Sequence, residues 1–132
     1  MKFFSRQFGE LECGDDMRVT IPHGLIGFEE WTEFIIVHDE DAEPFRWLVS
    51  TQSSDLCFPL IDPAEIVSEY APAIPKNGHD GPVELFAIVC LRPTLGETTA
   101  NLKSPIVIDA QTRTGRQVVL TDDQYSIAHK LF

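Results

Sequence analysis

The side chains that could carry covalent chemistry in this sequence lack the partners that such chemistry needs. Ser50, Ser53 and Ser54 lie close together, but no spacing pairs them with a histidine, and the G-x-S-x-G turn of serine hydrolases does not occur. The phosphate-binding pattern G-x-x-x-x-G-K-[ST] is also missing. The two glycines of residues 24–27 therefore predict a tight turn rather than a phosphate cradle.

The residues that could ligate a metal or act as acid and base also lack the spacing of a known site. The four histidines are scattered without an i, i+4 pair, and residues 38–41 (His-Asp-Glu-Asp) lack the EF-hand spacing, which favours a solvated acidic loop. Asp62 is a candidate acid or base, but the turn that ends a strand also places Asp before a proline. We therefore predict no catalytic residue, no cofactor and no metal, and expect that the protein is not an enzyme.

Short apolar segments between turn residues must supply the scaffold. They are rich in β-branched and aromatic residues, which favours an all-β domain with little helix. The predicted strands are 18–21, 34–37, 45–49, 56–61, 83–91, 105–108 and 117–120, the last two forming a hairpin around the loop 109–116. Residues 64–70 could form two helical turns, and Asp122 could cap a short C-terminal turn. Pro105 is expected at the first position of its strand.

Length and composition fit one ordinary globular domain. The chain has 132 residues, 43% of them apolar, so we predict a single domain over residues 1–132, with a Pro/Gly-rich mobile loop at about 71–82. Three cysteines at long spacings indicate a reducing cytoplasm, with Cys57 and Cys90 in apolar runs where buried thiols are common. The first residues do not resemble a signal peptide, and no stretch nears the ~20 apolar residues that span a bilayer.

The charge is strongly acidic and unevenly distributed. The formal net charge is −11; residues 1–70 hold 15 acids and 4 bases, whereas residues 71–132 hold six of each. Such a chain repels nucleic acids and anionic membranes, and it attracts a basic partner protein. Aromatic residues are concentrated in the same acidic half. Most should be core, but one or two beside acids would suit an interface with a basic-rimmed apolar surface.

Several blocks of the sequence together resemble one family. The blocks are residues 21–29 (IPHGLIGFE), 44–50 (PFRWLVS), 58–63 (FPLIDP), 98–108 (TTANLKSPIVI) and 116–120 (RQVVL), with Tyr125 after the last. In order and spacing they resemble FliW, the bacterial flagellar assembly factors, from near residue 8 to the end. The chain departs from the family pattern at Asp109, where Asn is usual, and at Val49, where Gln is frequent.

The resemblance implies a compact antiparallel β-barrel-like fold without catalysis or cofactor. It also implies two cytoplasmic partners: flagellin, and CsrA, the RNA-binding repressor of flagellin translation, which the freed protein binds and antagonises. No direct contact with nucleic acid or membrane is expected, and the protein is expected to be a monomer.

Partner-binding residues are predicted from charge and from loop position. We expect the acids to supply a field for basic CsrA, although they could serve solubility alone, and Asn101, Lys103 and Tyr125 could bind a partner or hold the fold. The predicted set is Glu29, Glu30, Glu33, Asp39, Glu40, Asp41, Glu43, Asn101, Lys103 and Tyr125. Two alternatives stay open: a flagellin chaperone without a CsrA role, and a small ligand-binding or hydrolytic β-barrel.

Overall fold

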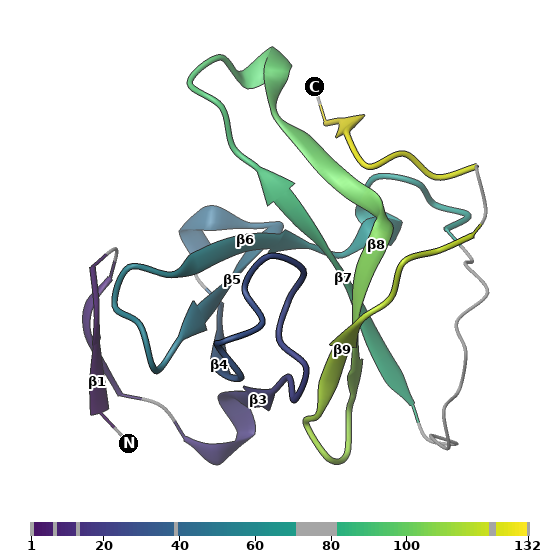
Figure 1. The fold of residues 1–132 in the computed structure, drawn as a ribbon. Coiled ribbons are helices and arrows are strands. Elements are labelled where there is room, and N and C mark those ends of the chain that lie inside the picture. Colours follow the sequence, from purple (N-terminus) through teal and green to yellow (C-terminus); the bar gives the residue numbers. More distant parts are fainter. Residues whose placement is uncertain are drawn as a thin grey trace.

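The computed structural model describes residues 2–6, 8–12, 14–38, 40–70, 82–121 and 124–131, which form β-strands joined by turns and 3-10 helices (Figure 1). The strands are β1 (Lys2–Ser5), β2 (Gly9–Glu12), β3 (Arg18–Thr20), β4 (Glu33–His38), β5 (Phe45–Ser50), β6 (Cys57–Ile61), β7 (Val83–Cys90), β8 (Thr99–Asp109), β9 (Gly115–Gln117) and β10 (His129–Lys130). The 3-10 helices are η1 (Asp15–Met17), η2 (Glu40–Ala42), η3 (Pro63–Glu65) and η4 (Leu95–Glu97).

Eight strands form one antiparallel sheet that curls almost into a barrel. The order is β10-β8-β7-β6-β5-β4-β3, and β9 also pairs with β8. Thr20 of β3 forms a parallel bridge with Thr114, directly before β9, and its N–H donates to the carbonyl of Arg113 at 3.0 Å. This contact brings the two ends of the sheet together. It confirms the predicted all-β, antiparallel barrel-like fold.

Alternation along the strands divides the apolar residues among three clusters. Phe34 and Leu48 belong to the main cluster, whereas their sequence neighbours Ile35 and Val49 belong to a cluster that Phe8 of the N-terminal hairpin covers. A third cluster lies under the C-terminal segment. The main cluster consists of Val19, Ile21, Leu25, Phe34, Leu48, Leu60, Phe86, Ile106 and Ile108. The β1–β2 hairpin forms its own small sheet beside the barrel, at the left of Figure 1.

The longest strand contains a large bulge. Asn101 of β8 lies opposite Ile88 of β7, but Ile106 lies opposite Phe86, so four residues of β8 face a single residue of β7. Pro105 lies within this bulge and not at the start of a strand, so its predicted position is wrong. A proline has no N–H to give to a ladder, and a bulge is one of the places in a sheet that tolerates it.

Other expectations are corrected in detail. The second strand of the predicted hairpin is β9, which ends at Gln117, although the N–H groups of Val118 and Leu120 still donate to carbonyls of β8 at 3.0 and 2.8 Å. Residues 64–70 form the short η3 and turns rather than a helix of two turns. Most of the loop predicted at 71–82, and Asp122, lie outside the described residues. Among the described residues, no helical segment has the length and apolarity needed to cross a membrane.

Candidate functional site

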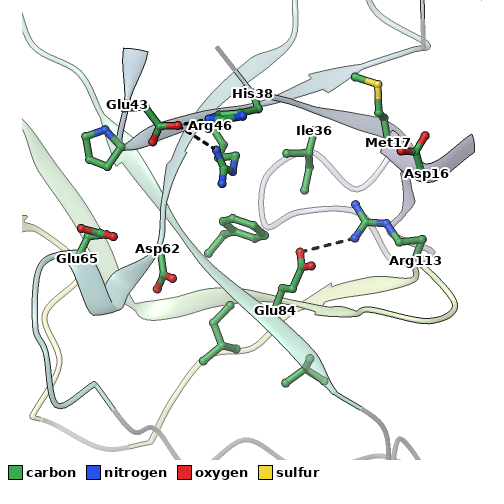
Figure 2. A pocket seen from close by; sticks show the side chains of 14 residues that line it. Asp16, Met17, Ile36, His38, Glu43, Arg46, Asp62, Glu65, Glu84 and Arg113 are labelled. Atoms are coloured by element: carbon green, nitrogen blue, oxygen red, sulfur yellow. Dashed lines mark hydrogen bonds and ion pairs between the residues drawn. The ribbon is translucent and has the colours of Figure 1, made fainter. Parts of the chain in front are cut away.

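An open cleft of about 690 Å³ lies between the β4–β5 connection, η3 and the start of β7 (Figure 2). Its walls carry five carboxylates, two guanidinium groups and one imidazole, so the described lining has an excess of negative charge. The lining residues are Asp16, Met17, Ile36, His38, Glu43, Pro44, Arg46, Asp62, Glu65, Val83, Glu84, Leu85, Phe86 and Arg113. We call it the acid-lined cleft.

The guanidinium and imidazole side chains of this cleft face carboxylates on its walls. Figure 2 shows His38 and Arg46 beside Glu43, and Arg113 beside Glu84 on another wall. The Arg46 Nη1 atom is 3.8 Å from Glu43 Oε1, and the Arg113 Nη1 atom is 3.6 Å from Glu84 Oε2. Two further carboxylates on the walls, Asp16 and Glu65, make no ion pair with any described residue.

Of the acids predicted to bind a partner, Glu43 lines the acid-lined cleft and the other described ones do not. Glu29 and Glu30 are exposed on the loop before β4, and Glu40 and Asp41 are exposed in η2. Glu33 is half-buried in β4, where its Oε2 accepts a hydrogen bond from Thr20 Oγ1 at 3.2 Å. Asp39 lies outside the described residues.

Four acids of the cleft were missed as binding residues: Asp16, Asp62, Glu65 and Glu84. They come from η1, from η3 and the residue before it, and from β7, which are three stretches far apart in the sequence. No spacing signal joins them, because the curvature of the sheet alone brings these elements to one opening.

The candidates for covalent or acid–base chemistry have structural roles. Ser50 is buried, and its Oγ accepts hydrogen bonds from the N–H groups of Gln52 and Ser53 at 3.1 and 3.0 Å. Asp62 caps η3, with its Oδ1 accepting from Ala64 N–H at 2.9 Å. In the described part of the chain, no group of three or more His, Cys, Asp or Glu could hold a metal ion.

A second opening, of about 390 Å³, is lined by apolar and neutral polar residues. It lies against the bulged part of β8 and the loop that follows β3. Its described lining holds no charged side chain: Leu25, Ile26, Phe28, Phe58, Ile88, Cys90, Thr99, Asn101, Ser104, Gln117 and Ile127. We call it the charge-free groove.

Asn101 lines this groove and also holds the backbone of the bulge. Its Oδ1 accepts hydrogen bonds from the N–H groups of Lys103 and Ser104 at 3.1 and 3.0 Å. Lys103 is half-buried within the bulge, and its carbonyl accepts from Leu120. The structure thus gives Asn101 a structural role, while a partner contact by either residue stays a prediction.

Tyr125 is buried in the cluster under the C-terminal segment, and a partner contact by this residue stays a prediction. It is 6% exposed, and its ring packs against that of Tyr70 with centroids 4.6 Å apart. The Tyr70 hydroxyl donates to the carbonyl of Leu102 at 2.7 Å. Burial, with a smaller contribution from Tyr125, raises the pKa of Tyr70 to about 12. The pair therefore closes the C-terminal cluster of the core.

The two described cysteines are free thiols in different surroundings. Cys57 is half-buried, and burial raises the pKa of its thiol to about 11. Cys90 is exposed at the end of β7, contrary to the expectation of a buried thiol, because its side chain faces the charge-free groove.

A nearly closed antiparallel sheet with an acid-lined cleft and a charge-free groove, both lined by described residues, defines a small β-barrel-like protein. The description "FliW protein" is that of the family whose model matches residues 2–131. This chain therefore belongs to the FliW family of flagellar assembly factors.

Individual relatives agree with this assignment. The chain is 35% identical to a flagellar assembly factor FliW of Desulfitobacterium hafniense, over 100% of this chain and 91% of the relative. It is 33% identical to one of Natranaerobius thermophilus, over 100% and 93%. A crystal structure of the flagellar assembly factor FliW superimposes with a TM-score of 0.88 at 31% identity, covering 100% of this chain and 97% of the other.

Proposed function

We propose that this flagellar assembly factor binds flagellin in the cytoplasm and, when flagellin is exported, binds and antagonises the repressor CsrA. Flagellin export would then relieve the repression of flagellin translation. One binding protein with two competing clients can do this without any catalytic step, because free flagellin reports how much subunit awaits export.

The acid-lined cleft is the observation that carries the CsrA part of the proposal. A protein that binds RNA must present basic surface. Five carboxylates around one opening, in a chain of net charge −11, attract such a surface and repel RNA beside it. Because exposed charges are screened beyond about 8 Å at physiological salt, acids at the point of contact matter most.

Calorimetric titration against the flagellin and the CsrA of the same organism tests this function. Each partner is titrated alone, then in the presence of the other, at two salt concentrations. We expect saturable binding of both, displacement of one by the other, and weaker CsrA binding at the higher salt concentration.

The alternatives correspond to distinct results of the same titration. Binding of flagellin without CsrA would support the dedicated chaperone and overturn the regulatory part of the proposal. Binding of neither partner would overturn the whole proposal.

A further inference from the structure

The charge-free groove exposes apolar side chains to water. Burying them under a partner would be favourable. Ile26, Phe28 and Ile127 are 59%, 40% and 65% exposed. All three line one opening, whereas exposed apolar residues in most soluble proteins are scattered singly. Water contact with this surface is unfavourable, and covering it would release that free energy.

The backbone that presents Ile26 and Phe28 is held rigidly. Gly24 has a φ of +68°, and the Phe28 N–H donates to the Leu25 carbonyl at 2.7 Å. The Ile26 N–H donates to Gln117 Oε1 at 2.9 Å, and Gln117 Nε2 donates in turn to the Ser104 carbonyl at 3.1 Å. These bonds fix the loop to β9 and to the bulge of β8, so a ligand would find the exposed side chains already in place.

The floor of the groove is formed by one face of the β7–β8 pair. Ile88 and Cys90 of β7 lie opposite Asn101 and Thr99 of β8, and all four side chains line the groove. The residues between them, such as Val89 and Ala100, belong to the buried C-terminal cluster on the other face. Phe58 of β6 forms one wall, and the ring of Phe28 packs edge-on against it with centroids 5.1 Å apart.

The chemistry of the groove selects its ligand. Eleven described residues line it without one charge, in a chain with 31 charged residues, so a charged side chain entering it would lose its hydration without a partner. The exposed acids Glu29 and Glu30 directly follow Phe28 and repel an acidic segment. The fitting ligand is an apolar segment without acidic residues.

We propose that the charge-free groove is the surface on which an apolar, non-acidic segment of the unassembled flagellin subunit docks. The inference rests on the proposed function for the identity of the client. A subunit that polymerises exposes, before assembly, apolar surface that its neighbours later bury. The groove covers such a segment and shares no described lining residue with the acid-lined cleft. Displacement of one client by the other would then come from overlap of the two bound proteins beyond these openings.

Charged substitutions at the exposed side chains test the groove without disturbing the core. We expect Ile26→Glu and Ile127→Glu each to weaken binding of monomeric flagellin about tenfold or more, since each removes an apolar contact and places a carboxylate in the groove. Ile26→Leu should bind as the natural protein does. Phe4→Glu is the matched control, because Phe4 is 63% exposed on the separate β1–β2 sheet.

Affinities are measured by calorimetry with purified flagellin monomer, after circular dichroism has shown that each variant is folded. Both groove variants should retain CsrA affinity, since neither residue lines the acid-lined cleft. If the natural protein binds flagellin and both groove variants bind it equally well, the groove is not the docking surface. If the natural protein itself fails to bind flagellin, the proposed function fails first, which separates the two results.

Discussion

At the scale of single residues, several polar side chains accept hydrogen bonds from backbone N–H groups in irregular turns. Asn101 caps the β8 bulge, and Asp109 does the same for the following turn, its Oδ1 accepting from the N–H groups of Gln111 and Thr112 at 2.8 and 3.0 Å. An Asn at position 109 could make the same two bonds. The departure from the family pattern at Asp109 therefore keeps the turn, because the acceptor oxygen is common to both residues.

Asn101→Ala should lower the free energy of unfolding by about 1–3 kcal/mol, because the Lys103 and Ser104 N–H groups lose their acceptor inside a half-buried bulge. Asn101→Asp keeps an acceptor oxygen and should lose less. Urea denaturation compares the two variants. Equal stability of Asn101→Ala and the natural protein would show that water replaces the lost acceptor.

Because of Tyr70, the free energy of unfolding should decrease as the pH rises into the alkaline range. The Tyr70 pKa of about 12 in the fold lies above the ordinary value of 10, so the folded state holds the phenol proton more tightly than the unfolded chain does. The resulting stability is fully present below pH 10 and is lost as the pH rises from 10 to 12. Tyr70→Phe cannot ionise, so its urea midpoint should fall less over this range. Parallel curves for the two proteins would contradict this.

At the scale of elements, the loop between β3 and β4 makes two consecutive tight turns, in which the Gly24 N–H donates to the Ile21 carbonyl and the Phe28 N–H donates to the Leu25 carbonyl. A Cβ added to Gly24 would lie 2.5 Å from the Cα of Glu29, and its φ of +68° strains any other residue. Gly27 has a φ of +88° but no heavy atom within 4 Å of such a Cβ, and Gly96 has neither constraint. Tight turning is confirmed at residues 24–27, although it comes from two turns, over residues 21–24 and 25–28, and their two glycines differ in what they tolerate.

Substitution of these glycines by Ala should give a graded loss of stability. We expect Gly27→Ala to cost about 1–2 kcal/mol from φ alone, Gly24→Ala to cost more because backbone must move, and Gly96→Ala to be nearly neutral. Thermal and urea unfolding of the three variants give the order. A Gly24→Ala variant as stable as Gly96→Ala would mean that the loop shifts freely, which would also weaken the argument for a rigid groove.

At the scale of the whole molecule, two double variants can separate the effect of net charge on CsrA binding from the effect of charge in the acid-lined cleft. Glu65→Lys with Glu84→Lys changes the acid-lined cleft, whereas Glu29→Lys with Glu30→Lys changes an exposed loop, and each pair raises the net charge by four. We expect the cleft pair to weaken CsrA binding several-fold more than the loop pair, with the difference shrinking at high salt. Calorimetry at low and high salt measures both.

Equal weakening by the two double variants would assign the attraction to the field of the whole molecule. Greater weakening by the loop pair would support the acids that charge patterning selected. Unchanged affinity of both at low salt would remove electrostatics from CsrA recognition.

The sequence alone determined the all-β class, five of the strands and the tight turning at 24–27, because these depend on short-range preferences. β-branched and aromatic runs favour strands, and only glycine accepts a positive φ without strain. The family was also visible in the sequence, because blocks such as 21–29 and 98–108 keep their order and spacing. The acidic excess was visible as well, since charge needs only counting.

Only the tertiary structure decided where the surfaces lie. Pro105 marks a bulge whose size depends on the register between β7 and β8, and register is a property of two strands. Asp16, Asp62, Glu65 and Glu84 meet at one cleft because the sheet curls until Thr20 reaches Thr114. Ile26 and Ile127, about a hundred positions apart, share one groove for the same reason: closure of a sheet makes neighbours of residues that no local pattern connects.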